Sequence, residues 1–487
     1  MLFNSYIFVM LFLPFALLGY YILNRIKKYQ AGMLFLLAVS LLFVGYMNVL
    51  YLPILLVSIL CNYGIYLFLK KKEKVLIKKW VLAFGVFFNV ALLFVFKYYD
   101  FFVENVNSIF KRDFPFLELL LPLGISFYTF QQLTFLIDCY RDDTIQVNFL
   151  EYALYISFFP QFIQGPIALQ SELVPQFRDK ANKNFQCESF ARGMYVFAMG
   201  LGKKVLLADT LSKVVNAGYD NIDKLNSPSA ILVILAYTLQ IYFDFSGYCD
   251  MALGLGEMFQ IRIPINFNSP YKSTSIDEFW DRWHITLTRF FTRYVYIPLG
   301  GSRKGKIRTY LNILIIFFLS GLWHGAAVTF IVWGLLHGVA MVVSRFLQQM
   351  KIVIPKALGW VCTFVFVNVA WVFFRADTLE RACDLFKKAI FGGFGSITKE
   401  LYESIDKIVE ISIVERLDIF GVGDIVPGYY LIILIIILIP ACVFMKNTQE
   451  KMSKLQFNLR EIIVTAVILF VSIISFSGIS EFIYFNF

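Results

Sequence analysis

Long apolar runs dominate the chain and predict membrane-spanning helices. They lie near residues 3–23, 31–46, 48–69, 79–98, 114–138, 229–259, 357–374, 429–445 and 461–483. Each approaches the roughly 20 residues that a helix needs to cross a bilayer. Only helices and closed barrels satisfy their backbone in hydrocarbon, and these continuous runs lack the alternation of barrel strands. The pattern predicts an all-α polytopic membrane protein of about eleven transmembrane helices.

Between residues 150 and 211 the apolar runs are short and interrupted. Prolines and glycines break them at Pro160, Gly165-Pro166, Gly200 and Gly202. Broken segments at membrane depth are tolerated only where they are buried in protein or line a cavity. We therefore expect one or more re-entrant or half-spanning helices beside a cavity. A cytoplasmic amphipathic stretch lying on the membrane is the alternative.

Lysine and arginine gather in short loops between the apolar runs. These loops are 25–28, 70–79, 302–308, 346–356 and 446–460. Such loops usually stay in the cytoplasm, because the positive-inside rule governs insertion. The N-terminus, the segment 376–428 and the C-terminus are then expected outside the cytoplasm.

The composition supports the membrane class and disfavours others. Hydrophobic residues make up 59% of the chain and charged residues 16%, whereas soluble domains carry about 25% charged residues. The net charge of +10 comes with the basic loops, and no basic–aromatic platform is visible, so we expect no nucleic-acid partner. The seven cysteines are scattered without a CxxC pair, which favours small apolar side chains over disulfides.

All three histidines of the chain lie within residues 271–338. His284 ends the stretch EFWDRWH, His324 lies in SGLWHG and His337 in WGLLHG. Histidine is the side chain whose ordinary pKa suits proton transfer near neutral pH. The clustering therefore predicts an active site in this stretch.

The residues before His284 predict a capped helix. Ser275 and Glu278 fit a capping box, so a helix is expected to begin at Ile276. Asp281 precedes His284 by three residues on this helix, and we expect its carboxylate to accept a hydrogen bond from the ring and to fix the tautomer. A histidine at the membrane interface without a catalytic role is the alternative.

His324 lies between two apolar stretches, 311–319 and 326–336, near the middle of a span-length segment. An unpaired imidazole there is costly, and the flanking Gly321 and Gly325 allow close approach of backbone or substrate. A buried, hydrogen-bonded imidazole can serve as a general base at neutral pH. A histidine that only bridges helices is the alternative.

His337 and two aspartates complete this set of candidate residues. His337 lies thirteen residues after His324, roughly 20 Å along a continuous helix, and is expected to be structural. Asp244 and Asp250 lie inside the apolar run 229–259, where a charge marks a functional group or a buried pair.

Other chemistries lack sequence support. There is no HExxH motif or third ligand at metal spacing, so we expect no metal. There is no GxSxG motif, and no cysteine neighbours a histidine. Direct transfer then remains, in which a histidine activates a hydroxyl for attack on an acyl thioester.

Several motifs resemble signatures of the bacterial branch of the membrane-bound O-acyltransferase (MBOAT) family. They are LPLGISFYTFQ at 121–131, YFDFSGY at 242–248, NFN at 266–268, FWDRWH at 279–284, YIPLGG at 296–301, GLWHG at 321–325 and WVFFRA at 371–376. The match follows the family's order along most of the chain. The chain resembles most the branch that acetylates polysaccharides such as alginate, and more distantly the branch that transfers D-alanine to teichoic acid.

The resemblance implies an MBOAT-type bundle of about eleven transmembrane helices, with re-entrant helices, around a tunnel. One integral membrane domain would cover 1–487, with N-terminal helices (1–110), a catalytic core (114–375), an extracellular segment (376–428) and C-terminal helices (429–487). His324 matches the family's catalytic histidine and His284 its second signature position. The residues expected to line the tunnel or to orient the reacting groups are Asp281, Asp244, Trp323, Trp283 and Tyr242.

We therefore expect a multi-pass O-acyltransferase of the bacterial inner membrane. It would move an acyl group, in the simplest case acetyl, from cytoplasmic acetyl-CoA or an acyl carrier protein to hydroxyls of an extracytoplasmic polysaccharide or a partner transfer protein. Alginate, cellulose, peptidoglycan and other exopolysaccharides are open as acceptors. D-alanyl transfer to teichoic acid and non-enzymatic transport of a polymer or lipid are the alternatives, and the lack of an inverted repeat disfavours transport.

Overall fold

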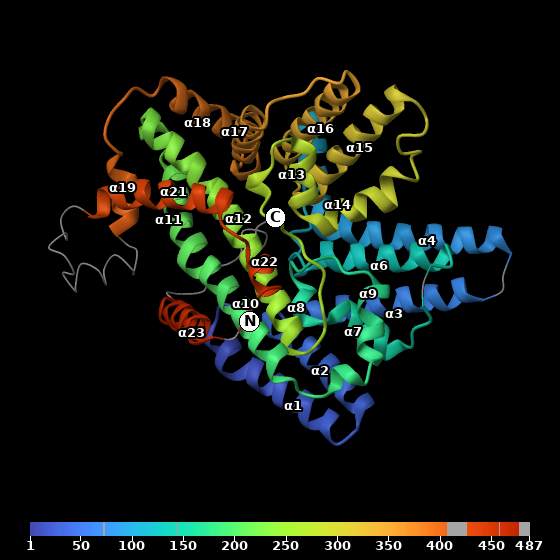
Figure 1. Cartoon of the computed structure of the whole chain (residues 1–487). Helices are drawn as coiled ribbons and strands as arrows, with labels where there is room; N and C mark the ends of the chain where they lie inside the picture. Colours follow the sequence, from blue (N-terminus) through green and yellow to red (C-terminus); the bar gives the residue numbers. More distant parts are fainter. Residues whose placement is uncertain (72–73, 144, 407–425, 457, 477–487) are drawn as a thin grey trace. The chain divides into compact units, whose positions relative to one another are not determined.

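The computed structural model describes residues 1–71, 74–143, 145–406, 426–456 and 458–476 (Figure 1). Within them, eight helices are long and apolar enough to span a membrane, and Leu431–Phe444 forms a shorter apolar helix. The eight are Phe8–Arg25, Tyr29–Met47, Tyr51–Lys70, Val75–Phe110, Ser227–Met258, Lys306–His324, Val328–Gln349 and Lys356–Arg375. The predicted all-α polytopic class is confirmed, and the count of about eleven stays a prediction.

The chain folds into two compact units built from separate stretches. The first comprises Met1–Phe197, Met251–Ile265 and Thr286–Ile297, and the second Ala198–Asp250, Asn266–Ile285 and Pro298–Phe487. The unit boundary falls within α10 (Cys187–Gly202), α12 (Ser227–Met258) and α14 (Ile285–Phe291). The predicted single domain over 1–487 with its four parts stays a prediction.

The first unit contains the N-terminal helices. Helices α1 to α4 pack against one another in chain order, and α6 packs against α3 and α4. The predicted spans 3–23, 31–46, 48–69 and 79–98 are confirmed. The bounds are η1 (Phe8–Phe12), α1 (Leu13–Arg25), α2 (Tyr29–Met47), α3 (Tyr51–Lys70), α4 (Val75–Leu93), η2 (Phe94–Tyr98), α5 (Tyr99–Phe110), α6 (Ile125–Tyr140), α7 (Phe149–Ser157), α8 (Phe159–Phe162), α9 (Gln170–Arg178), η3 (Ala181–Lys183) and η7 (Thr292–Tyr296).

The predicted span 114–138 is wrong, because its first half is not helical. Residues 112–122 have no regular structure, and α6 begins only at Ile125, after Gly124 in a left-handed conformation (φ 73°). The carboxylate of Asp100 accepts hydrogen bonds from the backbone of Leu117 (2.8 Å) and Glu118 (3.0 Å). These side-chain contacts hold part of the apolar run in an irregular conformation where hydropathy alone predicts a helix.

The predicted broken helices at 150–211 are confirmed in part. Helices α7 and α8 are short, and every residue from 151 to 170 is buried. Gly200 and Gly202, however, do not interrupt the helical path, because α10 ends at Gly202 and continues directly into the π-helix η4 (Lys203–Ala208) and α11 (Asp209–Asp220). Residues of this region line a polar pocket that is described below, and the expected membrane-embedded cavity stays a prediction.

The second unit contains the three histidines. In it α16 packs against α15, α17 and α13, and α19 packs against α11 and α21. The remaining bounds are η5 (Ile222–Lys224), η6 (Pro270–Lys272), α13 (Ile276–Arg282), α15 (Lys306–His324), α16 (Val328–Gln349), α17 (Lys356–Arg375), α18 (Leu379–Phe391), α19 (Lys399–Asp406), α21 (Val426–Phe444), α22 (Thr448–Met452) and α23 (Leu459–Ile474).

Most of the C-terminal predictions agree with these bounds. Helix α17 matches the predicted span 357–374, α21 matches 429–445, and α23 begins where 461–483 was expected. Residues 477–483 of that last span and residues 407–425 of the segment 376–428 lie outside the described residues. The predicted orientation of the chain in the membrane stays a prediction.

Residues 311–336 form a helical hairpin instead of one span. Helix α15 ends at His324, and α16 begins at Val328. Glycines allow the two helices to touch, since a Cβ on Gly334 would lie 2.3 Å from the Phe317 carbonyl oxygen and 3.1 Å from the Cα of Gly321. The expectation that Gly321 permits close backbone approach is confirmed, but the mid-span position of His324 is wrong.

We expect Gly334→Ala to destabilise this hairpin. The added methyl group must displace backbone, which typically costs about 1–3 kcal/mol. The thermal midpoint of the purified protein in detergent should therefore fall. Gly64→Ala is the matched control, because a Cβ there meets no atom within 4 Å. Equal midpoints for the two variants would contradict the crowding.

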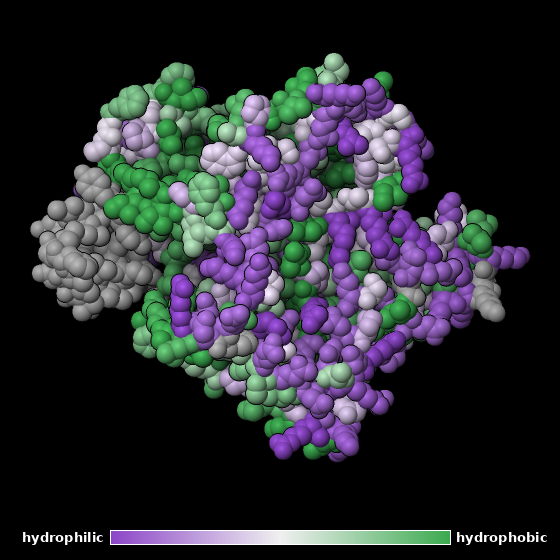
Figure 2. Space-filling view, in the orientation of Figure 1, coloured by the Kyte–Doolittle hydropathy of each residue, from purple (hydrophilic) through white to green (hydrophobic). Residues whose placement is uncertain are grey.

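Apolar side chains also cover much of the outer surface. On α21, for example, Ile433, Ile436 and Ile437 are all exposed, and Figure 2 shows the hydrophobic surface over this helix. Extended apolar surface of this kind is rare on soluble proteins and marks contact with lipid or protein. The protein is therefore a multi-pass membrane protein.

Candidate active site

Helix α13 leads into the first histidine, and its start agrees with the prediction. The Ser275 hydroxyl accepts a hydrogen bond from the Glu278 amide (3.2 Å), so the helix begins at Ile276. In a capping box the Glu278 carboxylate would accept from the amide of Ser275 itself. Here it accepts instead from the amide of the preceding residue, Thr274 (2.8 Å). The cap fixes where the helix starts.

His284 lies in a break between α13 and α14. Its φ of 46° is left-handed, a conformation that costs an L-residue roughly 1–2 kcal/mol. An antiparallel bridge between Phe267 and Trp283 holds the break. In it the Asn268 amide donates to the Arg282 carbonyl (2.9 Å), and the Ile285 amide donates to the Asn266 carbonyl (3.0 Å). The predicted continuous helix through His284 is wrong, because these tertiary bonds replace helical ones.

Asn266, and not Asp281, contacts the His284 ring. Nδ1 of His284 lies 3.2 Å from Oδ1 of Asn266. Asp281 is exposed on α13, whereas His284 is fully buried. The predicted hydrogen bond from His284 to Asp281 is therefore wrong, since α13 ends before His284 and leaves the two side chains in different surroundings. Burial lowers the pKa of His284 to about 3, so its imidazole is neutral at physiological pH.

His324 ends α15 beside His284. The two rings, from positions forty residues apart, have centroids 6.5 Å apart. The ring of His324 also packs against Trp323 (4.8 Å), Trp333 (4.9 Å) and Phe374 (5.2 Å). His324 is 3% exposed. The predicted pairing of these two histidines in one place is confirmed, and their catalytic roles stay predictions.

Aromatic side chains enclose the histidine pair. Trp323 contacts both rings, with a centroid distance of 6.0 Å to His284, and Phe245 packs on His284 at 4.8 Å. Trp283 packs against Trp371 at 4.9 Å in the next layer, and Tyr242 lies against Trp283 at 6.4 Å. Water is thus kept from the imidazoles, which strengthens electrostatic interactions at the site. Trp323 therefore contacts the histidines directly, whereas Trp283 and Tyr242 belong to the next layer of aromatic packing.

His337 belongs to the packing behind the site. It is fully buried, and its Nδ1 accepts a hydrogen bond from the indole N–H of Trp280 (3.3 Å). Trp333 contacts both His337 (5.0 Å) and His324. This arrangement supports the structural role expected for His337.

Asp244 and Asp250 form buried ion pairs on neighbouring turns of α12. Lys204 Nζ lies 2.7 Å from Asp244 and 2.9 Å from Asp209, and the side chains of Lys204 and Asp244 are each 2% exposed. Lys203 Nζ lies 2.6 Å from Asp250. The structure thus favours a buried pair for Asp244, and its expected place on a tunnel wall stays a prediction. Both lysines come from the π-helix η4, a type of turn frequent at functional sites.

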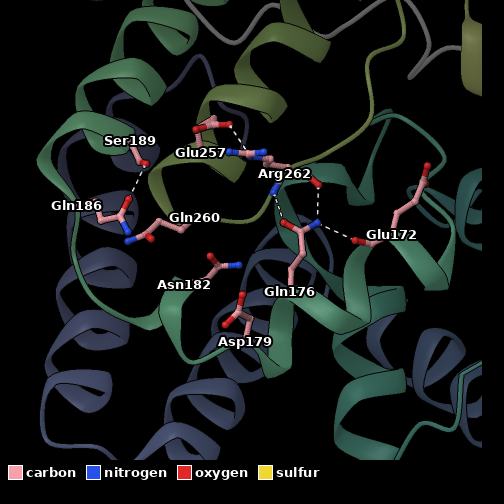
Figure 3. Close-up of a pocket in the computed structure, with 9 residues that line it drawn as sticks. All are labelled: Glu172, Gln176, Asp179, Asn182, Gln186, Ser189, Glu257, Gln260 and Arg262. Atoms are coloured by element: carbon pink, nitrogen blue, oxygen red, sulfur yellow. Dashed lines mark hydrogen bonds and ion pairs between the residues drawn. The ribbon is translucent and has the colours of Figure 1, made fainter. Parts of the chain in front are cut away.

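A separate polar pocket lies in the first unit (Figure 3). Its volume is about 490 Å³. Gln176 hydrogen-bonds Arg262 and Glu172 at its wall, and Glu257 faces Arg262. The residues predicted for the reaction do not line it. Among the described residues, His, Cys, Asp and Glu side chains form no group of three or more able to hold a metal ion.

Known protein sequences match this chain over all the residues of the site. Residues 136–379 match the family model of the membrane-bound O-acyltransferases (MBOAT). The peptidoglycan O-acetyltransferase of Helicobacter pylori is 40% identical over 100% of this chain and 98% of its own length. The probable alginate O-acetylase AlgI of Pseudomonas aeruginosa is 38% identical over 80% of this chain and 74% of its own. The teichoic acid D-alanyltransferase of Bacillus subtilis is 27% identical over 48% of this chain and 61% of its own length.

Proposed function

The chain belongs to the membrane-bound O-acyltransferase family, and from this premise we propose that it acetylates hydroxyl groups of an extracytoplasmic polysaccharide. The observation that carries the proposal is the pair of buried imidazoles of His284 and His324, 6.5 Å apart between ring centroids. A proton acceptor in a site without water is what attack of a hydroxyl on a thioester requires.

Peptidoglycan is the acceptor that we propose first. The peptidoglycan O-acetyltransferase matches this chain over nearly the full length of both proteins, whereas the alginate O-acetylase matches 74% of its own length. The D-alanyltransferase matches about half of this chain at 27% identity, which supports that alternative less. The family membership argues against a transporter without enzymatic activity.

His324 is the proposed base. It takes the proton of the acceptor hydroxyl while the hydroxyl oxygen forms a bond to the thioester carbonyl carbon. The carbon–sulfur bond then breaks, and the proton passes from His324 to the leaving sulfur, so that an ester and a free thiol result. No covalent enzyme intermediate is required. His284 contacts the reacting groups from the side opposite His324.

Charge is the argument that supports the proposed donor and the proposed direction of transfer. Acetyl-CoA and acyl carrier proteins are anionic, and the basic loops between the helices would attract them. If those loops are cytoplasmic, the acetyl group enters from the cytoplasm and leaves on the outer face of the bacterial inner membrane, directly or through an extracytoplasmic partner protein. Both termini would then lie outside.

A reconstituted assay tests the proposal. Purified protein in liposomes should transfer label from acetyl-CoA to soluble peptidoglycan fragments, and liposomes without protein should not. Alginate fragments and a D-alanyl carrier protein serve as parallel substrates. Transfer from the D-alanyl carrier with none from acetyl-CoA would contradict acetylation, and transfer to alginate alone would contradict the choice of peptidoglycan.

A further inference from the structure

We propose that Asn266 is a positioning residue that fixes His284 in the tautomer carrying its hydrogen on Nδ1. Nε2 of His284 then acts only as a hydrogen-bond acceptor in the reaction. The inference rests on the proposed acyl transfer for its catalytic consequence, whereas the tautomer itself is a property of the resting protein.

Asn266 holds the backbone on which His284 depends. Its carbonyl oxygen accepts the amide hydrogen of Ile285 (3.0 Å), the residue directly after His284. The bridge of the next residue, Phe267, to Trp283 secures the other side of the break. A non-glycine residue stays left-handed only where the surrounding structure determines it. The same short segment therefore sets the backbone of His284 and contacts its ring.

The Asn266 amide has a second partner besides the His284 ring. Nδ2 lies 3.6 Å from Sγ of Cys249, where it donates a weak hydrogen bond. In this orientation the carbonyl oxygen Oδ1 faces Nδ1 of His284 at 3.2 Å. Since a carbonyl oxygen only accepts, Nδ1 of the imidazole must carry the hydrogen. In the neutral ring Nε2 is then left with a lone pair.

Nε2 lies on the side of the ring away from Asn266. Among the described residues this buried atom has no hydrogen-bond partner, and the ring's neighbours include His324, Trp323 and Phe245. An acceptor in this position can take a hydrogen bond from a substrate hydroxyl or from the imidazole of His324. It cannot donate one to a thioester carbonyl, so polarisation of the donor by neutral His284 is ruled out in this tautomer.

The tautomer can be read directly, because the chain has only three histidines. Protein labelled with ¹⁵N-histidine in lipid should give three ring-nitrogen pairs, and His284→Ala identifies the pair of His284. We expect a protonated Nδ1 and an unprotonated Nε2 for His284, distinguished by their couplings to the ring protons. A protonated Nε2 would overturn the assignment whatever the activity of the protein.

Variants of Asn266 test the positioning role. Asn266→Leu removes the acceptor and should lower kcat by on the order of 10–100-fold, the loss usual for partners that orient metal-binding histidines, with KM for acetyl-CoA little changed. Asn266→Asp keeps an oxygen against Nδ1 and should retain more activity. A merely structural role predicts the reverse order, because a buried carboxylate is harder to accommodate than leucine.

Asn368→Leu is the matched control. Asn368 is a buried asparagine of the same unit that accepts a hydrogen bond from the Thr238 hydroxyl (2.6 Å). If Asn368→Leu lowers kcat as much as Asn266→Leu at similar thermal stability, the positioning role is overturned. If the wild-type protein transfers no acetyl group but the ¹⁵N spectrum shows Nδ1–H, the proposed function fails and the tautomer stands.

Discussion

Replacing His324 by alanine should lower acetyl transfer by about 10²–10⁴-fold, the usual contribution of a positioned general base. His324 ends α15 and faces His284 with 6.5 Å between ring centroids. Without this imidazole, the histidine pair loses one of its two proton acceptors. The measurement is the initial rate of label transfer from acetyl-CoA in liposomes, with the amount of folded protein checked by size-exclusion chromatography.

His337→Gln is the control for this prediction. His337 is buried as completely as the other two histidines, and its hydrogen bond comes from Trp280 in the packing behind the site. Glutamine can still accept from the indole, so transfer should stay within several-fold of wild type. An active His324→Ala protein, or a His337→Gln protein that folds normally and is inactive, would refute the assignment of roles within the histidine stretch.

Replacing Lys204 by methionine should strongly destabilise the second unit. Lys204 bridges Asp244 and Asp209, at 2.7 and 2.9 Å. Removing one partner of a buried ion pair leaves an uncompensated charge and typically costs about 3–5 kcal/mol. The expected result is a large fall in the thermal midpoint in detergent and a low yield of folded protein.

Two further variants show whether charge is the cause. Lys387→Met removes a lysine from an exposed pair with Asp384, and such pairs contribute little, so its midpoint should match wild type. Lys204→Met combined with Asp244→Leu should recover part of the loss, because apolar replacement of both partners of a buried pair is often tolerated. A Lys204→Met protein as stable as Lys387→Met would disprove the argument.

The sequence predicts those features that local chemistry determines. Hydropathy identifies the helices from α1 to α4 and α17, and the side chain of Ser275 fixes the start of α13. The pairing of His284 with His324 was expected because a chain so poor in histidine places all of them within one stretch. In each case the residues that carry the signal are neighbours in the chain.

Tertiary contacts account for the errors. The break at His284 depends on a bridge to Phe267, and no helical periodicity predicts it. Asp281 has the right spacing for a hydrogen bond on a continuous helix, but the helix ends first, and Asn266 takes its place. The span 114–138 failed because the Asp100 side chain holds the backbone of Leu117 and Glu118. The NFN motif at 266–268 was visible in the sequence but carried no sign of its role.

The crowding of indoles around the histidines gives the protein an optical probe of its own. Of the seven tryptophans, Trp80 is exposed, whereas five pack against the histidines or against one another, namely Trp280, Trp283, Trp323, Trp333 and Trp371. Most of the indoles therefore lie in the packing around the histidines. A donor or acceptor that reaches the pair should alter the emission of the unlabelled protein, so binding can be followed separately from turnover.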